Sequence, residues 1–160
     1  MSNGDYRTVA GRIRQELNAL EEVAARAAGA WAEAAESPGG YAVDAAALNL
    51  HGFYAGLERV FVLVAERIDE SVPAGAAWHQ ELLRQMAVDL PGIRPPVISE
   101  QSATGLDRYR GFRHVVRNVY AYVLDPQRVA ELVDGLPSLL ARVRAELTAF
   151  ADVLEEIAGG

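Results

Sequence analysis

The sequence contains no cysteine and no lysine, only three histidines, and no long uninterrupted hydrophobic run. Without cysteine there can be no disulfide framework, thiolate metal site or cysteine nucleophile, which fits a reducing compartment such as the cytoplasm. Three histidines leave little for a metal centre, so we expect no metal and no other cofactor. A membrane span needs about 20 apolar residues, and residues 1–5 lack the pattern of a secretion signal. We therefore expect a cytoplasmic protein that does not enter a membrane.

The charges that are present are unevenly divided. All fifteen basic residues are arginine, and 22 acidic residues give a formal net charge of −7 at pH 7. The field of the whole molecule would repel RNA, so any contact with nucleic acid has to be local. The 160 residues suffice for one hydrophobic core but not for two ordinary domains, so we expect a single domain over residues 1–160.

Leucine, valine and aromatic residues recur at spacings of three and four, which is typical of amphipathic helices, while alternating strand-like runs are scarce. Segments rich in proline and glycine separate the helical runs, and Asp125-Pro126 has the pattern of a helix start. The predicted helices cover roughly 6–36, 43–70, 78–88, 100–124, 126–135 and 136 to the C-terminus. We expect an all-α fold, an antiparallel helical bundle of four long helices plus one or two short ones.

The predicted helix at 100–124 carries a cluster of arginines. On a helical wheel Arg110, Arg113 and Arg117 fall within about 60° of one another, beside the apolar face, and His114 and Asn118 follow further round. Such a cluster is unfavourable unless acids or an anionic ligand neutralise it, and the guanidinium fork matches phosphate oxygens. Two interpretations remain open at this point: salt bridges with acidic residues, or a phosphate-binding face.

The string RHVVRNVY at residues 113–120 resembles the motif of the HEPN superfamily. In that motif an arginine and a polar neighbour are followed, after four to six intervening residues, by a histidine, and in the HepT ribonuclease toxins by a tyrosine two residues further on. Segments 49–59 and 78–84 resemble the HepT-like branch as well, so the likeness runs from about residue 43 to residue 157. The resemblance implies a HEPN-like bundle.

Carried over by position, the resemblance implies that Arg113 is the motif arginine, His114 its polar neighbour and Tyr120 the tyrosine that partner nucleotidyltransferases adenylylate. Asn118 stands where the family has its histidine, and a carboxamide cannot transfer protons near neutral pH. Either His114 has taken over the acid–base task, or this member has lost cleavage and kept binding. Arg108 with His114 is a second formal match, which ranks lower because Arg108 lies away from the cluster.

The implied function is that of a metal-independent endoribonuclease, in which the ribose 2′-hydroxyl attacks the adjacent phosphate. It would be the toxin of a toxin-antitoxin pair, neutralised by a cognate nucleotidyltransferase antitoxin, and would form a homodimer through the helix at 113–120. The alternative is a non-catalytic module that binds RNA, nucleotide or a protein partner, and a third possibility is a structural protein with paired arginines. The expected site comprises catalytic Arg113, His114 and Asn118, RNA-binding Arg110, Arg117 and His79, and the modification site Tyr120.

Other polar residues receive simpler interpretations. His51 is expected on a helix surface or at an interface, as is usual for histidine. Glu58 and Arg59 are expected to form a solvated or bridging pair. Trp78 is expected to anchor the core, which leaves the neighbouring His79 as a second contact point for RNA.

Overall fold

The computed structural model describes residues 2–118 and 124–160. Every regular element within these two ranges is helical, and the one strand-like feature there is an isolated bridge between Leu90 and Arg94. The elements are α1 (Asn3–Glu36), α2 (Ala42–Val64), the π-helical turn η1 (Ala65–Asp69), α3 (Trp78–Met86), α4 (Glu100–Arg117) and α5 (Pro126–Gly159). None of these helices is long and apolar enough to span a bilayer.

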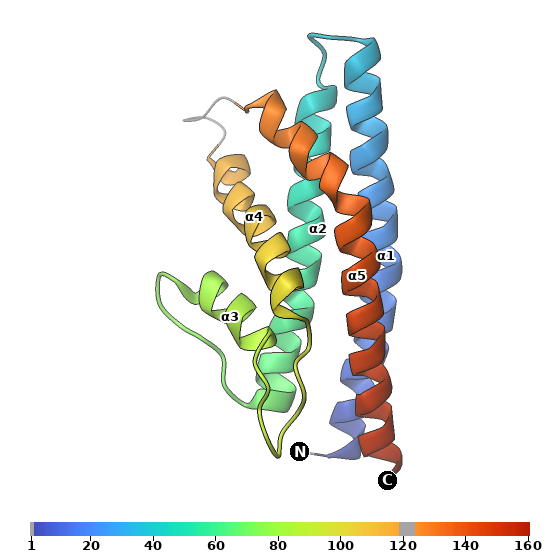
Figure 1. Cartoon of the computed structure of the whole chain (residues 1–160), viewed down its shortest axis with the longest axis vertical. Helices are drawn as coiled ribbons and strands as arrows, with labels where there is room; N and C mark the ends of the chain where they lie inside the picture. Colours follow the sequence, from blue (N-terminus) through green and yellow to red (C-terminus); the bar gives the residue numbers. More distant parts are fainter. Residues whose placement is uncertain (1, 119–123) are drawn as a thin grey trace.

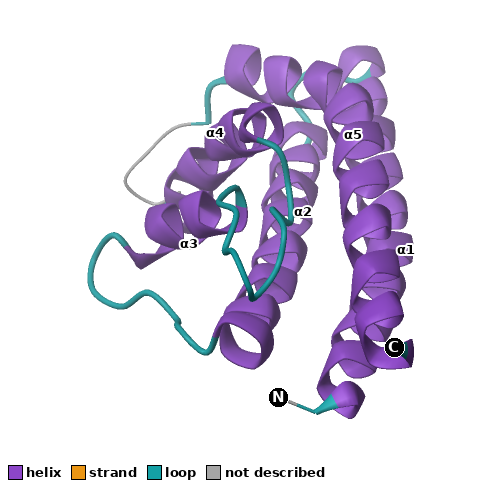
Figure 2. Cartoon of the chain, turned by 60° about the horizontal axis from the view of Figure 1, so that its bottom comes forward, coloured by secondary structure: helices purple, strands orange, loops and turns teal. Residues whose placement is uncertain are grey.

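The four long helices alternate in direction, as Figure 1 shows, and the two ends of the chain lie at the same end of the bundle. Helix α1 packs against α2 and α5, while α4 packs against α2 and α5. The short α3 lies beside α4 and contacts both α4 and α2 (Figure 2). The predicted antiparallel bundle of four long helices with one short helix is therefore confirmed.

Side-chain caps explain where three of the helices begin. Ser2 and Asp5 form a capping box at the start of α1, in which each side chain accepts a hydrogen bond from the other residue's backbone N–H. The Ser99 hydroxyl accepts the Ser102 N–H at 3.1 Å at the start of α4. The Asp125 carboxylate accepts the Gln127 N–H at 3.0 Å, and Pro126 opens α5, as predicted.

The predicted break between two C-terminal helices is wrong, because α5 is one helix of 34 residues that runs through Gly135 and Pro137. A proline inside a helix costs about 3 kcal/mol, since it removes one backbone hydrogen bond and crowds the preceding turn. Buried Leu136 and Leu140 continue the apolar stripe across this position, and burying each such side chain contributes about 1.5–3 kcal/mol. Packing therefore outweighs the local penalty, and the first part of α5 is inclined to the rest (Figure 1).

The long irregular segment between α3 and α4 is fastened to the end of α2. Arg94 is 3% exposed, and its Nε and one terminal nitrogen donate to the Asp69 carboxylate at 2.6 and 2.8 Å. Gln85 of α3 donates to the same carboxylate at 2.8 Å. This buried node holds η1, α3 and the proline-rich segment together, and so sets the position of α3 beside α4.

Helix α4 is shorter than predicted, since it ends at Arg117 with Asn118 as its C-cap. The side-chain amide of Asn118 donates to the His114 carbonyl at 2.7 Å, which satisfies an acceptor that the helix end would otherwise leave open. Most of the remaining predicted helix, residues 119–123, lies outside the described residues, and so does the expected modification site Tyr120.

Candidate functional site

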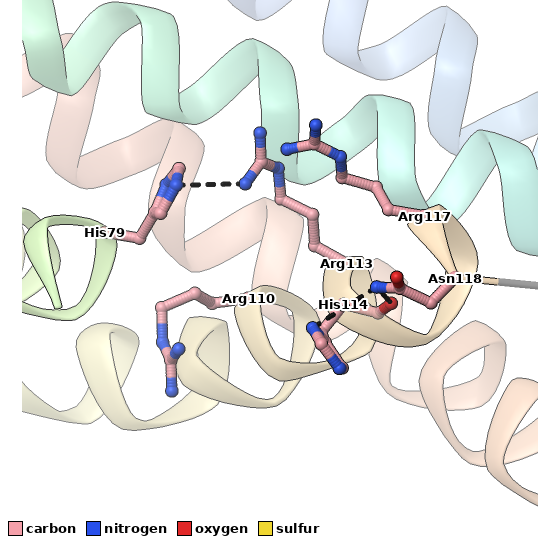
Figure 3. Close-up of a pocket in the computed structure, with 6 residues that line it drawn as sticks. All are labelled: His79, Arg110, Arg113, His114, Arg117 and Asn118. Atoms are coloured by element: carbon pink, nitrogen blue, oxygen red, sulfur yellow. Dashed lines mark hydrogen bonds between the residues drawn. The ribbon is translucent and has the colours of Figure 1, made fainter. Parts of the chain in front are cut away.

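The polar face of α4 and the first turn of α3 surround a pocket of about 430 Å³ (Figure 3). All six residues expected to take part in catalysis or RNA binding line this one pocket. They are His79 from α3 and Arg110, Arg113, His114, Arg117 and Asn118 from α4 and its C-cap. The structure thus brings His79 to the five residues of α4 and its C-cap from a distant part of the chain.

The opposite face of α4 explains why these side chains turn outward. Leu106, Tyr109 and Phe112 are buried in the core at helical spacing. The Tyr109 hydroxyl donates to the Leu132 carbonyl of α5 at 2.6 Å, and burial raises the pKa of Tyr109 to about 12. Because this face is anchored, the polar residues between its positions are held toward α2, α3 and solvent.

The three pocket arginines differ in how they are neutralised. Arg110 forms an ion pair with Asp107 on the same helix at 2.6 Å. Arg113 donates from a terminal nitrogen to His79 Nε2 at 3.1 Å, and its buried Nε has no hydrogen-bond partner in the described chain. Arg117 is exposed and makes no ion pair with any described residue. Only one of the three arginines therefore follows the interpretation in which the cluster is tied up by acids.

The pocket is locally positive although the protein carries a net charge of −7. No acidic side chain is among its lining residues in the part of the chain that the structure describes. Arg113 and Arg117 point toward α2 (Figure 3), and their positive charges act on His51 of that helix. Burial lowers the pKa of His51, and Arg113 and then Arg117 lower it further. Its Nδ1 is buried without a hydrogen-bond partner among the described residues, while the residue as a whole is half-buried, so of the two expected positions, helix surface or interface, the one between helices fits better.

Glu58 is buried behind the pocket, and the expected pairing of Glu58 with Arg59 is wrong. Arg59 is exposed and pairs with Glu16 of α1 at 3.2 Å, whereas Glu58, 7% exposed, lies 2.7 Å from His79 Nδ1. Neighbouring residues on a helix point about 100° apart, so Glu58 faces α3 while Arg59 faces α1. The sequence held a signal for this, because Glu58 lies four residues after Tyr54 and three before Phe61, in the core-facing stripe.

The ring of His79 is fixed by its sequence neighbour as well. Trp78 packs against the core, as expected, and its ring lies over that of His79 with centroids 3.6 Å apart and planes inclined by 30°. His114 and Asn118 lie at the exposed end of the pocket, with the Asn118 amide nitrogen 3.4 Å from His114 Nδ1. His79 therefore lies at one end of the pocket, and His114 and Asn118 lie at the other end (Figure 3).

Arg108, the residue of the second formal motif match, lies away from the pocket. It is exposed and pairs with Glu131 of α5 at 3.4 Å. This placement agrees with the sequence analysis, in which the match of Arg108 with His114 ranks below that of Arg113. No group of three or more histidine, aspartate or glutamate side chains in residues 2–118 and 124–160 is arranged to hold a metal ion.

A helical bundle that carries an arginine- and histidine-lined pocket on one helix is the architecture expected of a HEPN-type protein. The family model described as HepT-like protein matches residues 45–154, more than half of the chain and all of the pocket residues. The chain therefore belongs to the HepT-like family. No curated protein and no solved structure was found to match it.

Proposed function

We propose that this protein is a HepT-type toxin ribonuclease that cleaves RNA in the pocket on α4. The observation that carries the proposal is that Arg113 and Arg117 line the pocket without a carboxylate partner among the described residues. Uncompensated guanidinium groups in one pocket repel each other, and a phosphodiester neutralises them. A volume of about 430 Å³ lies in the range of pockets that hold small ligands, which is sufficient for a nucleotide.

The proposed reaction is attack of the ribose 2′-oxygen on the adjacent phosphorus, which leaves a cyclic phosphate and a free 5′-hydroxyl. Arg113 and Arg117 bind the nonbridging phosphate oxygens and stabilise the charge that grows on them in the transition state. Arg110 and His79 contact the RNA on the α3 side, and His114 and Asn118 lie on the other side of the same phosphate position. Proton transfer needs an imidazole, which both His79 and His114 can supply.

The proposed biological setting is a toxin-antitoxin pair with a nucleotidyltransferase antitoxin. It rests on membership of the HepT-like family and on the exposure of His114, Arg117 and Asn118, which leaves this surface accessible for a second copy of the chain. We propose a homodimer through α4, so that two pockets adjoin. Tyr120, three residues after Arg117 in the sequence, is the proposed adenylylation site, and the negative charge of the added phosphate would oppose RNA binding.

A second candidate function is RNA binding without cleavage. It is favoured by Asn118, which occupies the position of the family histidine and whose amide bonds to the carbonyl of its own helix at 2.7 Å. An amide in that arrangement caps the helix and carries no proton to a leaving group. The arginines alone would then account for binding.

Incubation of the purified full chain with a short RNA in excess chelator tests the ribonuclease function. We expect cleavage products that end in a 2′,3′-cyclic phosphate. The matched control is the same RNA with a single 2′-deoxy residue at the cleaved position, which should bind equally but remain intact because it lacks the attacking oxygen. Binding of both oligonucleotides without cleavage of either would instead support the binding module.

Coexpression with a minimal nucleotidyltransferase encoded beside this chain tests the partner. The toxin hypothesis predicts that expression of the chain alone stops growth, and that coexpression restores growth and adds the mass of AMP to the peptide containing Tyr120. Growth arrest that persists with the catalytically intact partner would contradict this part of the proposal.

A further inference from the structure

Three helices contribute to a chain of polar contacts behind the pocket. Glu58 Oε2 of α2 lies 2.7 Å from His79 Nδ1 of α3, and His79 Nε2 lies 3.1 Å from a terminal nitrogen of Arg113 on α4 (Figure 3 shows the second contact). The Glu58 side chain is 9% exposed, whereas the His79 side chain is 23% exposed and lines the pocket. The buried end of this chain is thus a carboxylate and the accessible part is an imidazole.

The contacts determine which ring nitrogen of His79 carries the proton. A guanidinium group can only donate hydrogen bonds, so His79 Nε2 has to accept the bond from Arg113. The ring proton then resides on Nδ1 and is donated to the Glu58 carboxylate. His79 is therefore a neutral imidazole whose Nε2 lone pair faces Arg113 beside the pocket, held in place by Glu58 and by the Trp78 ring.

The other two histidines are in different positions. His51 does not line the pocket, and its Nδ1 is buried without a hydrogen-bond partner among the described residues. His114 lines the pocket but is exposed, and its Nδ1 lies 3.4 Å from the amide of Asn118. In His79, a short bond to a buried carboxylate and access to the pocket coincide.

We propose that His79 is the catalytic residue that takes the proton of the attacking 2′-hydroxyl, and that Glu58 is its positioning residue. This assignment rests on the proposed ribonuclease function. It replaces the family histidine, whose position holds Asn118, by an imidazole from a different helix. A carboxylate on Nδ1 suits this role, because it holds the ring orientation and stabilises the imidazolium that forms when Nε2 takes a proton.

Arg113 couples this base to the substrate. Without RNA, Arg113 occupies the Nε2 lone pair of His79. A phosphate in the pocket offers Arg113 a charged acceptor in place of a neutral one, so the guanidinium turns to the phosphate and Nε2 becomes available. The 2′-oxygen then gives its proton to Nε2 as it bonds to phosphorus and the bond from phosphorus to the 5′-oxygen breaks. The 5′-oxygen takes a proton from solvent, and His79 returns its proton to solvent, so protons and charge balance.

The test compares His79→Ala and Glu58→Gln with the intact full chain, measuring RNA affinity and the rate of cleavage at saturating RNA. In His79→Ala we expect the rate to fall about 10²–10⁴-fold, the usual contribution of a proton-transfer group, with a much smaller change in affinity. Added imidazole should restore part of the lost rate, since the deleted ring leaves room for it beside Glu58. A merely structural histidine would not be rescued in this way.

Glu58→Gln is the second variant, because the glutamine oxygen can still accept the bond from Nδ1–H while the charge is gone. We expect a smaller fall in rate and a displaced acidic limb of the pH–rate profile, which reports the base that must be unprotonated. Among the described residues, Glu58 of α2 and Arg113 of α4 contact His79, and Arg110, His114 and Arg117 of α4 line the same pocket. Glu81→Gln, an exposed carboxylate on α3, is the matched control and should leave both measurements unchanged.

The outcomes separate this assignment from the function on which it rests. Intact protein that binds RNA without cleaving it overturns both. Cleavage by the intact protein that survives in His79→Ala overturns the assignment alone, as does a loss in His79→Ala that imidazole does not rescue and that RNA affinity follows in parallel. Loss and imidazole rescue in His114→Ala, with His79→Ala still active, would move the proton transfer to His114.

Discussion

Arg94 is buried and Arg113 is half-buried, but the two arginines differ in how many of their N–H groups have hydrogen-bond partners. Arg94 uses all five of its N–H bonds, two of them on the Asp69 carboxylate and the others on the carbonyl oxygens of Gln85, Val88 and Pro95. Arg113 bonds to His79, and its buried Nε has no partner among the described residues. A guanidinium whose N–H groups are all hydrogen-bonded within the protein stabilises the fold. A guanidinium with an unpaired N–H group can still bind a ligand.

Two outer arginines that join α1 to α5 are also paired with carboxylates, as Arg94 is. Arg14 of α1 pairs with Asp152 and Glu155 of α5 at 2.6 and 3.2 Å, and Arg144 of α5 pairs with Glu21 of α1 at 3.2 Å. Exposed pairs of this kind contribute little stability, but they leave no concentrated charge. Arg113 and Arg117 of α4 differ from these, because they line one pocket together and have no carboxylate partner among the described residues.

The largest expected effect is the destabilisation caused by Arg94→Ala. Removing the guanidinium leaves Asp69 buried without a countercharge, so we expect the free energy of unfolding in urea to fall by about 3–5 kcal/mol. The double variant Arg94→Met with Asp69→Leu removes both charges and should recover much of that loss. A loss for Arg94→Ala below about 1 kcal/mol, the size of an exposed pair, would remove the distinction between the two arginines.

Arg113→Ala should show the reverse pattern. We expect RNA cleavage to fall about 10²–10³-fold, the effect of deleting one preorganised donor to a developing anion. The free energy of unfolding should change by no more than about 1 kcal/mol, because no carboxylate among the described residues is hydrogen-bonded directly to Arg113. Arg108→Ala is the matched control on the same helix, since Arg108 pairs with Glu131 outside the pocket. Equal loss of activity in Arg108→Ala would contradict the placement of the site.

How much of this could be read from the sequence depends on whether the determinant is local. Helix positions were predictable because apolar spacing and caps such as Asp125 act within a few residues. The break at Pro137 was predicted wrongly, because the local cost of proline was weighed without the packing of Leu136 and Leu140 on either side. Local rules therefore identify helices better than they identify where packing carries a helix through a breaker.

The same distinction applies to the site. The residues of α4 were found together because they share one helix face, and their grouping needs only helical geometry. The contact between Glu58 and His79 joins positions 21 residues apart on different helices, and only the tertiary structure shows it. The sequence assigned Glu58 to its neighbour Arg59, but a residue in the core-facing stripe is paired by whatever packs over it, which is α3.

A smaller effect is expected in the salt dependence of RNA binding. Each phosphate contact that is lost should reduce the slope of log affinity against log salt concentration by about 0.7 for single-stranded RNA. We expect this reduction for Arg117→Ala, measured by fluorescence anisotropy over a salt series. Arg144→Ala removes the same charge from the scaffold, where it is paired with Glu21, and should leave the slope unchanged. Equal slopes in the two variants would mean that the paired and unpaired arginines do not differ toward RNA.

The smallest expected effect concerns His51, which senses the unneutralised arginines from α2. Its pKa lies below the ordinary 6.5 because of burial, and then because of Arg113 and Arg117. Below pH 6.5, His51 takes up a proton in the unfolded chain more readily than in the folded chain. The free energy of unfolding therefore falls as the pH falls through this range. Arg113→Ala removes one of the repelling charges, so the pKa of His51 should rise in an NMR titration while staying below 6.5, since burial remains. Arg144→Ala should leave it unchanged. A His51 pKa that is the same in the intact protein and in Arg113→Ala would show that the guanidinium of Arg113 is already neutralised where it faces α2, and the contrast with Arg94 would be lost.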